Sequence, residues 1–398
     1  MTKKLLKSHK DLMNSLLKMM SQKDYSTITV SQICHDAGYN RGTFYQNYSS
    51  KDDLLNDVID TKIIEMFTVL KPKLRFTQQS YQQPSEDLSL HNLFVFIKQN
   101  YFFFKTMIED RHIIGFRSKI FLHYQHYLED LLRNPIDNPD KDPGIDKFYY
   151  VYVTSASLGI MMYWLNQGLK QSTDYLIQQF LSIVYKRPHE LIYGDIPFKH
   201  FKSKTQKESD PRILRTKKAL SNSFTQLMKV LKYSDIKVTD ILEHAQYNRS
   251  TFYSHYKSKD DLFFDAVSDF VEGMVQSLRQ TNDDHSMDPT MTQSPLIHLF
   301  TFIYENSTIL EVIGENNKVP GFYNKIYSGL VAFFYEELEG RFDYDIGIYS
   351  NYLASTLLGV ISLWISEELR YSPRYMAKLF KLSLNNPPNR RTNKTLVF

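Results

Sequence analysis

The sequence has very little cysteine, because Cys34 is the only one among 398 residues. A single thiol excludes an internal disulfide and any metal site built from several cysteines. Cys34 falls at an apolar position of a predicted helix. A buried structural thiol is therefore a better interpretation than a redox sensor.

Long apolar runs are lacking as well. No run reaches the ~18 residues that a membrane span needs. The basic residues near the N-terminus are not followed by an apolar core of signal-peptide length. We therefore expect a cytoplasmic protein.

The usual signatures of catalysis are also lacking. The sequence contains no glycine-rich loop of the kind that cradles phosphate and no recognisable pairing of a nucleophile with a base. His123 and His126 are three residues apart on a predicted helix, but no acidic or third ligand accompanies them, and a surface pair is the better interpretation. We expect a protein that is not an enzyme and that holds no metal or cofactor.

The sequence does contain a long internal repeat. Residues 39–54 and 247–262 are identical at 12 of 16 positions, at an offset of 208. Weaker matches follow at offsets of 206 and 200: residues 93–97 with 299–303, and Leu158, Gly159 and Trp164 with Leu358, Gly359 and Trp364. The chain is therefore a tandem duplication with small deletions in its loops. Its length also exceeds what one core usually accommodates.

Each copy begins with the layout of a helix-turn-helix unit. In the first copy, apolar residues at helical spacing predict a helix over residues 3–20. Thr29 can cap a short helix that ends at a glycine, and Asn40 can cap the next short helix, over residues 41–48. A longer helix follows over residues 50–70. Two short helices joined by a glycine-containing turn after a longer one are typical of DNA-binding units.

The rest of each copy predicts apolar helices and no convincing strand, so the fold class is all-α. In the first copy these helices cover residues 91–109, 116–132, 147–169 and 173–185, with loops over 73–89 and 134–144. We expect two tandem units, each with a three-helix head and an all-α body. The predicted domains are head 1 over 1–48, body 1 over 49–187, a linker over 188–209, head 2 over 210–256, body 2 over 257–384 and a tail over 385–398.

Residues 29–33, 37–45 and 50–54 resemble the TetR family of bacterial transcriptional regulators. The matching pattern covers about 30 residues in each half, whereas the bodies resemble the family only in the order and length of their helices. The resemblance implies a three-helix DNA-binding head, a connecting fourth helix and an all-α ligand-binding body. In that family two subunits pair through their last two long helices. Here one chain carries both heads, which implies a covalent pseudo-dimer, with pairing between two chains as the alternative.

The second copy departs from the pattern at two positions. Gln246 stands where Gly38 does, so the turn tolerates a side chain at some conformational cost. Lys237 replaces Thr29, which removes a cap and adds a charge. The recognition stretch itself is intact, so we expect both heads to bind DNA.

The second short helix is the predicted recognition helix. A helix fits the major groove of B-DNA, and its N-terminal residues reach base edges. Arg41 and Arg249 are the best candidates for contacting guanine. The resemblance adds phosphate or base contacts by Thr43, Tyr45 and Lys51. The candidate DNA-binding residues are Thr29, Asn40, Arg41, Gly42, Thr43, Tyr45, Gln46, Asn47 and Lys51 in head 1, and Asn248, Arg249, Ser250, Thr251, Tyr253, Ser254, His255 and Lys259 in head 2.

The two recognition helices are not identical. Gln46 corresponds to Ser254 and Asn47 to His255, and these pairs should read slightly different bases. We therefore predict a double-stranded DNA operator with two similar but unequal half-sites.

Aromatic residues in the bodies offer a candidate effector site. Tyr101, Phe104, Trp164 and Trp364 can line a pocket for a small apolar effector, as the resemblance implies, although aromatic residues at helical spacing more often form plain core. We predict a ligand-responsive repressor, cytoplasmic and associated with the nucleoid. The alternative is a protein-interaction module of the same fold in which one or both heads are silent.

Overall fold

The computed structural model describes residues 3–70, 88–109, 116, 119–124, 126, 143–186, 210–280, 295–314, 322–340 and 345–385. Within these ranges every regular element is a helix, which confirms the all-α fold class. The predicted linker and all but the first residue of the predicted tail lie outside them. The chain divides into two compact units, one with residues 1–141, 160–186 and 387–398, the other with residues 142–159 and 187–386.

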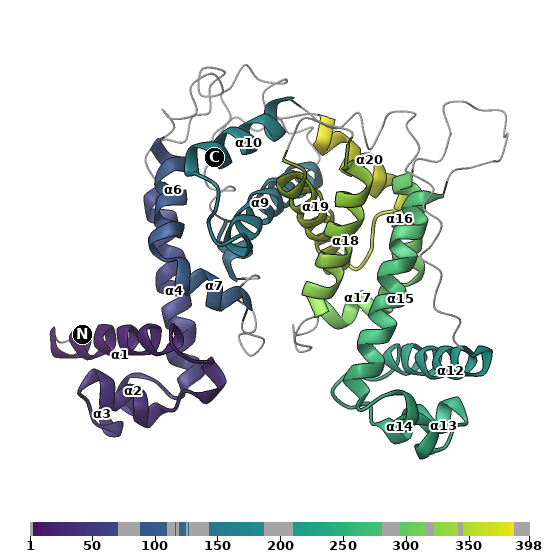
Figure 1. Cartoon of the computed structure of the whole chain (residues 1–398), viewed down its shortest axis with the longest axis horizontal. Coiled ribbons are helices and arrows are strands. Elements are labelled where there is room, and N and C mark those ends of the chain that lie inside the picture. Colours follow the sequence, from purple (N-terminus) through teal and green to yellow (C-terminus); the bar gives the residue numbers. More distant parts are fainter. Residues whose placement is uncertain are drawn as a thin grey trace. The chain divides into compact units, whose positions relative to one another are not determined.

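The head of the first unit is a three-helix unit at the foot of a long helix (Figure 1). Its elements are α1 (Lys3–Met20), the short 3-10 helix η1 (Tyr25–Thr27), α2 (Val30–Ala37) and α3 (Arg41–Asn47), followed by α4 (Lys51–Leu70). Helix α1 contacts α2, α3 and α4. Leu12, Leu16 and Phe44 are completely buried in this core. These bounds agree closely with the sequence prediction.

The body of the first unit differs from the prediction at several points. Helices α6 (Leu88–Gln99) and α9 (Pro143–Asn166) begin inside the predicted loops, and most of the helix predicted over 116–132 lies outside the described residues. The single helix expected over residues 91–109 is two helices, α6 and α7 (Tyr101–Glu109). Asn100 lies at the break, and its side-chain amide donates to the Phe96 carbonyl at 2.9 Å. An asparagine that bonds to a nearby carbonyl competes with the helical backbone, which favours a turn here. Helix α6 packs on α4 and on α10 (Thr173–Lys186).

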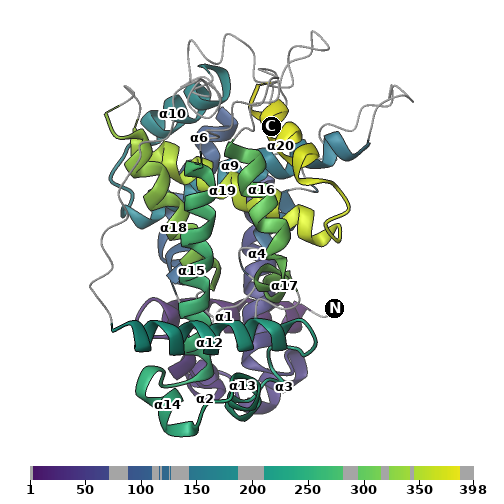
Figure 2. The ribbon, with the colours of Figure 1, turned by 90° about the vertical axis from the view of Figure 1, so that its right-hand side faces the viewer.

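The second unit repeats the head with α12 (Pro211–Met228), α13 (Val238–Ala245), α14 (Arg249–His255) and α15 (Lys259–Arg279). In Figure 2, α12 crosses the foot of α15, with α13 and α14 below it. The body adds α16 (Pro295–Glu305), α17 (Ser307–Gly314), α18 (Phe322–Leu338), α19 (Ile346–Ser366) and α20 (Pro373–Asn385). Helix α16 packs on α15 and α20, and α18 packs on α15 and α19.

The second unit also contains the first part of α9 (Pro143–Asn166), which lies against α19. Tyr152 and Tyr352 are related by the 200-residue offset of the repeat, and their hydroxyl groups form a hydrogen bond. A Cβ at Gly159 would lie 2.6 Å from the Ser355 Cβ. A Cβ at Gly359 would likewise overlap the Ser155 side chain. The contact is reciprocal, because each glycine faces the serine of the other copy.

Helix α19 is the most apolar of the long helices. Its length and composition would allow it to cross a membrane, which corrects the expectation that no segment of the sequence meets that requirement. However, 78% of its most apolar 18-residue window is buried inside the protein. Burial of this extent is typical of the core helix of a water-soluble domain, where apolar surface is removed from water by neighbouring helices.

Candidate nucleic-acid interface

Local hydrogen bonds fix the start of each recognition helix. The Asn40 side-chain oxygen accepts from the Thr43 amide at 2.8 Å, and Asn248 accepts in the same way from Thr251, also at 2.8 Å. Such N-caps stabilise a helix by ~1 kcal/mol. The cap occupies the side-chain oxygen of each asparagine. Asn40 and Asn248 therefore position the recognition helix, and only their side-chain nitrogens remain for a contact with DNA.

The turn before each recognition helix is left-handed in both heads. Gly38 has φ 74° and ψ 28°, and Gln246 has φ 58° and ψ 39°. The expected cost of a side chain at this turn is therefore present in the second head. The Thr29 side chain accepts from the Gln32 amide at 3.3 Å, whereas Lys237 makes no side-chain cap and its backbone amide donates to the Asp240 carboxylate at 2.8 Å.

One face of each recognition helix is buried and the opposite face is exposed. In the first head, Phe44 is completely buried and Tyr48 nearly so. Arg41 is exposed, and its guanidinium donates to the Tyr45 hydroxyl at 3.4 Å. Tyr45 itself is 51% exposed, which is unusual for a large aromatic side chain of a folded head. The exposed arginine and tyrosine form a cation–π pair at the N-terminal end of the helix.

The second head repeats this arrangement. Phe252 is completely buried, and the Arg249 guanidinium lies 5.6 Å from the ring centre of Tyr253, which is 47% exposed. Ser250 takes the place of Gly42, and its hydroxyl donates to Asn248 at 2.7 Å. Arginine stacks on aromatic faces and presents several donors in a rigid fork, which suits bidentate contact with a base edge.

The polar residues that differ between the two recognition helices fall into two groups: those bonded to their own helix and those available for other contacts. The Asn47 amide donates to the Thr43 carbonyl at 2.7 Å, and the Ser254 hydroxyl donates to the Thr251 carbonyl at 2.7 Å. Both side chains are therefore turned back to their own helix. Gln46 is exposed and His255 is half-buried beside Tyr256. The side chains available for different base contacts are thus Gln46 in one head and His255 in the other.

Lys51 and Lys259 have a structural role that the sequence did not indicate. The Lys51 ammonium donates to the carbonyls of Tyr25 and Ile28, each at 2.8 Å. Lys259 donates in the same way to Tyr233 and Ile236, and burial lowers the pKa of its ammonium. Each lysine therefore ties the start of the long helix to the turn before the second head helix.

A further cluster joins the end of each recognition helix to the first and fourth helices of its head. In the first head, the Tyr48 hydroxyl donates to Asp57 at 2.8 Å, and His9 lies 2.9 Å from the same carboxylate. The Tyr48 pKa is raised by burial and by this hydrogen bond. In the second head, Tyr256 donates to Asp265 at 2.6 Å, and Lys217 takes the place of His9 at 3.1 Å. Sequence reasoning missed this cluster, although its tyrosine and aspartate are identical in the two copies.

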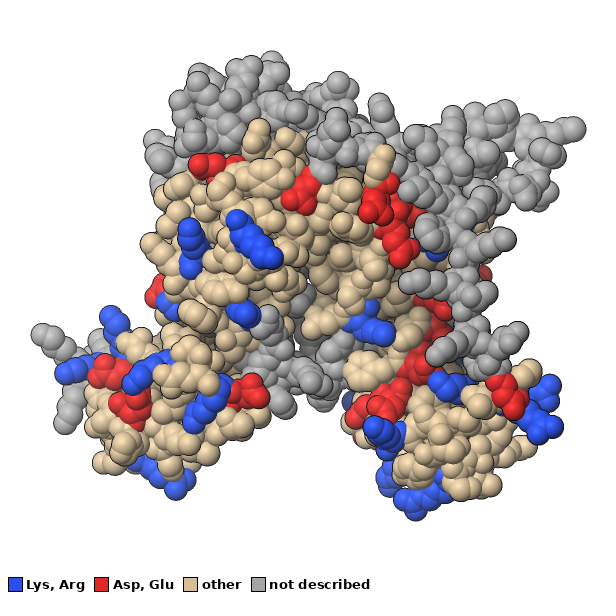
Figure 3. Space-filling model, viewed as in Figure 1, with Lys and Arg blue, Asp and Glu red and all other residues tan. Residues whose placement is uncertain are grey.

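The charges around the recognition helices favour a polyanion. In Figure 3, Lys and Arg side chains lie at the end of each head that carries its second and third helices. Residues 1–57 carry 8 Lys/Arg against 6 Asp/Glu, and residues 211–265 carry 10 against 6. This excess is modest, so binding to phosphate would depend on where the cations lie and not on a large net charge.

Comparisons with known proteins agree with this geometry. Residues 12–58 match the family described as "Bacterial regulatory proteins, tetR family". Residues 87–186 and 290–386 both match the "Transcriptional regulator C-terminal region" of TetR proteins, so the body occurs twice. The chain belongs to the TetR family. It is also 21% identical, over 92% of its length and 93% of the relative's, to the "Uncharacterized HTH-type transcriptional regulator YxbF" of Bacillus subtilis (strain 168).

The chain is therefore a TetR-family transcriptional regulator with a DNA-binding helix-turn-helix, and its two matches to the C-terminal region are consistent with the tandem duplication. Proteins of this family are transcription factors, which agrees with the expectation of a chain without catalytic signatures. Among the described residues, no group of three or more His, Cys, Asp and Glu side chains could hold a metal ion.

The four aromatic residues proposed for an effector site lie in different environments. Phe104 and Trp164 are buried, and the Trp164 ring packs edge-on against Phe94. Tyr101 is half-buried in the first unit. Trp364 is also buried, but it lines a cavity of about 150 Å³ in the second unit. The structure thus places one of the four candidates at a cavity.

Cys34 is buried in α2, and burial raises the pKa of its thiol. A raised pKa leaves less thiolate, which is the reactive form. This environment agrees with the interpretation of Cys34 as a structural residue.

Proposed function

We propose that this TetR-family chain binds a two-part DNA operator with both of its heads, one in each of two successive major grooves ~34–36 Å apart. The observation that carries the proposal is the exposed arginine on a tyrosine at the start of each recognition helix, Arg41 on Tyr45 and Arg249 on Tyr253. Each arginine would contact guanine, while backbone amides and threonine hydroxyls near the helix start contact phosphate.

In this proposal the two copies pair within one chain. The reciprocal contact of α9 with α19 supports it, since Gly159 faces Ser355 and Gly359 faces Ser155. Reciprocal contacts between equivalent residues are the hallmark of a two-fold interface. A two-fold axis requires that a residue on it meet its own copy, and the Tyr152–Tyr352 hydrogen bond fits that requirement.

The two half-sites would be similar but unequal. Arg41 and Arg249 are the same residue in the two heads, so both half-sites should contain the guanine. The exposed Gln46 would favour adenine at a neighbouring position, because a glutamine amide can bond to both N6 and N7 of that base. Ser254 is bonded to its own helix and His255 replaces Asn47, so the second half-site should differ there.

Binding of the operator would repress transcription by occluding a promoter, and a small effector in one or both bodies would release it. The effector would act through α4 and α15, which carry the heads. It can shift the occupancy of the operator only by as much as its affinity differs between the DNA-binding and released states.

The first test is selection of binding sites from random duplex DNA with the purified chain, with the mass of the complex measured by light scattering. We expect an enriched two-part site bound by one chain. A two-part site bound by two chains would keep the DNA function and overturn pairing within the chain. No enriched site at low salt would overturn operator binding and favour a partner-binding module.

The second test removes the two recognition arginines. Arg41→Ala with Arg249→Ala should weaken binding to the selected site by about 1–3 kcal/mol for each arginine. Arg374→Ala with Lys378→Ala removes the same charge from exposed positions of α20 and is the matched control. Equal losses in the two double variants would show that the arginines contribute only net charge and would contradict base reading.

A further inference from the structure

The cavity beside Trp364 lies between the first part of α9, the end of α19 and α20, all in the second unit. Its volume of about 150 Å³ equals that of an apolar cavity known to accommodate one benzene ring. The apolar part of its wall consists of Phe148, Leu363, Trp364, Met376 and Leu379. Four of these five side chains are buried, so a ring placed here would be removed from water.

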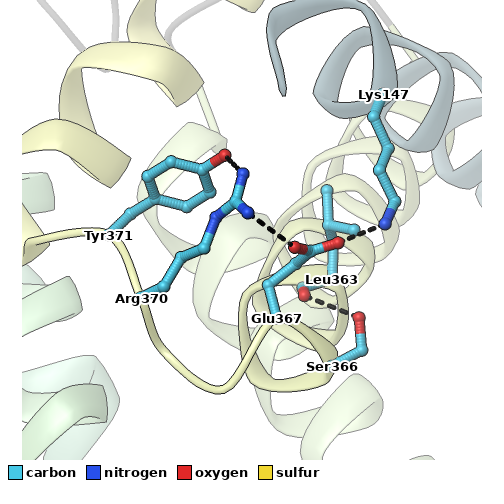
Figure 4. A network of polar contacts seen from close by, with 6 residues as sticks. All are labelled: Lys147, Leu363, Ser366, Glu367, Arg370 and Tyr371. Atoms are coloured by element: carbon cyan, nitrogen blue, oxygen red, sulfur yellow. Dashed lines mark hydrogen bonds and ion pairs between the residues drawn. The ribbon is translucent and has the colours of Figure 1, made fainter. Parts of the chain in front are cut away.

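The remaining lining residues are charged or polar and form one network (Figure 4). Lys147 reaches from α9 to the carboxylate of Glu367, with which it forms a hydrogen bond. The Arg370 guanidinium lies 3.6 Å from the other oxygen of Glu367 and donates to the Tyr371 hydroxyl. Two cations therefore lie beside a single carboxylate, and the Lys147 ammonium holds the pKa of that carboxyl below its usual range.

The turn that carries Glu367 and Arg370 has an unusual backbone. Glu368 and Leu369 both have a positive φ, 54° and 55°. The equivalent turn of the first copy has the same left-handed backbone, with Gly168 at φ 66° and Leu169 at φ 59°, so only Glu368 adds a side chain at a strained position. A left-handed residue with a side chain costs roughly 1–2 kcal/mol, and such strain is commonly found at ligand sites.

The network joins residues of both copies, and its charged residues have no charged equivalents at two of three positions on the other side of the repeat. At the 200-residue offset, Lys147 corresponds to Gly347 and Glu367 to Gln167, while Arg370 corresponds to Lys170. Trp364 and its hydrogen bond to the Tyr371 carbonyl are preserved as Trp164 and Gln171. Charged groups from both copies, Lys147 from the first and Glu367 and Arg370 from the second, therefore surround only one of the two equivalent tryptophans.

We propose that this cavity binds a small organic anion with a single aromatic ring, such as an aryl carboxylate. The ring lies against Trp364 and Phe148, and the carboxylate is bound by Lys147 and Arg370. The size of the cavity limits the apolar part to one ring, and the excess of cations selects an anion. That the anion acts as the effector rests on the proposed function. Binding of the anion at this cavity does not.

Benzoate is the probe, and tryptophan fluorescence is the readout. The chain has two tryptophans, so Trp164→Phe leaves Trp364 as the single reporter. At constant ionic strength, benzoate should change this fluorescence with saturation. Benzyl alcohol, which has the ring without the charge, should bind more weakly. A saturable signal that is no stronger for benzoate than for benzyl alcohol would overturn the selection of an anion.

The two cations that line the cavity, which we call its rim, are tested by the double variant Lys147→Gln with Arg370→Gln. Both side chains are substantially exposed, so the fold should be kept. Affinity for benzoate should fall about tenfold or more, because two charged hydrogen bonds are lost, while affinity for benzyl alcohol is unchanged. Lys170→Gln changes the equivalent cation of the first copy and should leave benzoate binding unchanged. Equal binding by wild type and the double variant would overturn the proposal.

If Trp164→Phe fails to fold, saturation-transfer NMR of the benzoate ring protons with the wild-type chain and the rim variant gives the same comparison. These experiments contain no DNA, and the selection of operator sites contains no benzoate. Absence of benzoate binding would therefore overturn the effector site alone, and absence of an enriched operator would overturn the proposed function alone.

Discussion

The two heads of this chain present the same arginine and tyrosine for recognition, but different residues support the recognition helix behind them. Both present an exposed arginine on a tyrosine and both cap the helix with asparagine. Behind that surface, His9 binds Asp57 in one head and Lys217 binds Asp265 in the other. Lys18 and Asp36 join α1 to α2 in the first head at 2.6 Å, and Gln226 and His244 stand at the equivalent positions.

The comparison teaches that the residues supporting a recognition helix from behind can change while the exposed arginine and tyrosine stay the same. A helix is held by its buried side chains and caps, and the partners of a surface carboxylate contribute little by comparison. Four changes test this difference, from the largest expected effect to the smallest.

Replacement of the buried phenylalanine should break one head and leave the other intact. Phe252→Ala removes a completely buried ring and should cost about 3–5 kcal/mol of the stability of head 2. Hydrogen exchange, measured by mass spectrometry on the full chain, should show faster exchange in α12–α14 only. Phe44→Ala is the reciprocal variant, with faster exchange in α1–α3. Faster exchange in both heads from either variant would contradict independent head cores.

The left-handed turn can be exchanged between the heads. Gln246→Gly should stabilise head 2 by roughly 1 kcal/mol, because glycine adopts a positive φ without a steric cost. Gly38→Gln should destabilise head 1 by a similar amount. No atom lies within 4 Å of a Cβ built at Gly38, so the cost there is conformational and not steric. Opposite changes in the hydrogen exchange of α2 and α13 are expected, and changes of the same sign would disprove this account.

The cation behind the recognition helix can also be exchanged. His9→Lys should give head 1 the ammonium that Lys217 has in head 2, and it should change the stability of head 1 by less than about 1 kcal/mol, because an ion pair at the surface contributes little. Lys217→His should have a similarly small effect on head 2. The measurement is the affinity of each variant for operators built from two copies of one half-site, together with the exchange rate of the head. A loss of operator affinity larger than the change in head stability would mean that the cation contacts DNA as well.

Acid should affect the first head through its extra ion pair. The Lys18 ammonium donates to Asp36 and lowers the pKa of that carboxyl from 3.8. A lowered pKa means that the pair stabilises the head above about pH 3.8, and that this contribution is lost as the pH falls through the folded-state value. Lys18→Met should therefore move the acid-induced loosening of α1–α2 slightly to higher pH. No comparable change is expected from Gln226→Met in head 2.

The sequence predicted most of the local structure of the heads because capping and burial depend on residues close together in the chain. Thr29, Asn40 and Gly38 have the roles expected of them, and Phe44 and Tyr48 face the core.

What the sequence could not predict depends on contacts between distant residues. The sequence assigned Lys51 a contact with phosphate or bases, and it did not predict that the Lys51 ammonium is bonded to carbonyls 23 and 26 residues earlier. The pairing of His9 with Asp57 requires three helices to be in place. The repeat did contain a signal for this pair: the aspartate is the same in both copies, as Asp57 and Asp265, and His9 is replaced by another basic residue, Lys217. The break at Asn100 was missed because apolar residues at helical spacing stand on both sides of the short polar stretch over residues 98–100.

The one-sided ion pair between Lys147 and Glu367 has a consequence for how this protein can evolve. In a dimer of identical subunits every substitution is made twice, so a lysine at position 147 would come with a second lysine across the symmetry axis. A duplicated gene encodes the two sides separately, and Gly347 and Gln167 could stay neutral while their copies became charged. A single mutation can therefore introduce a charge on one side of the contact between α9 and α19, while the equivalent residue on the other side stays unchanged.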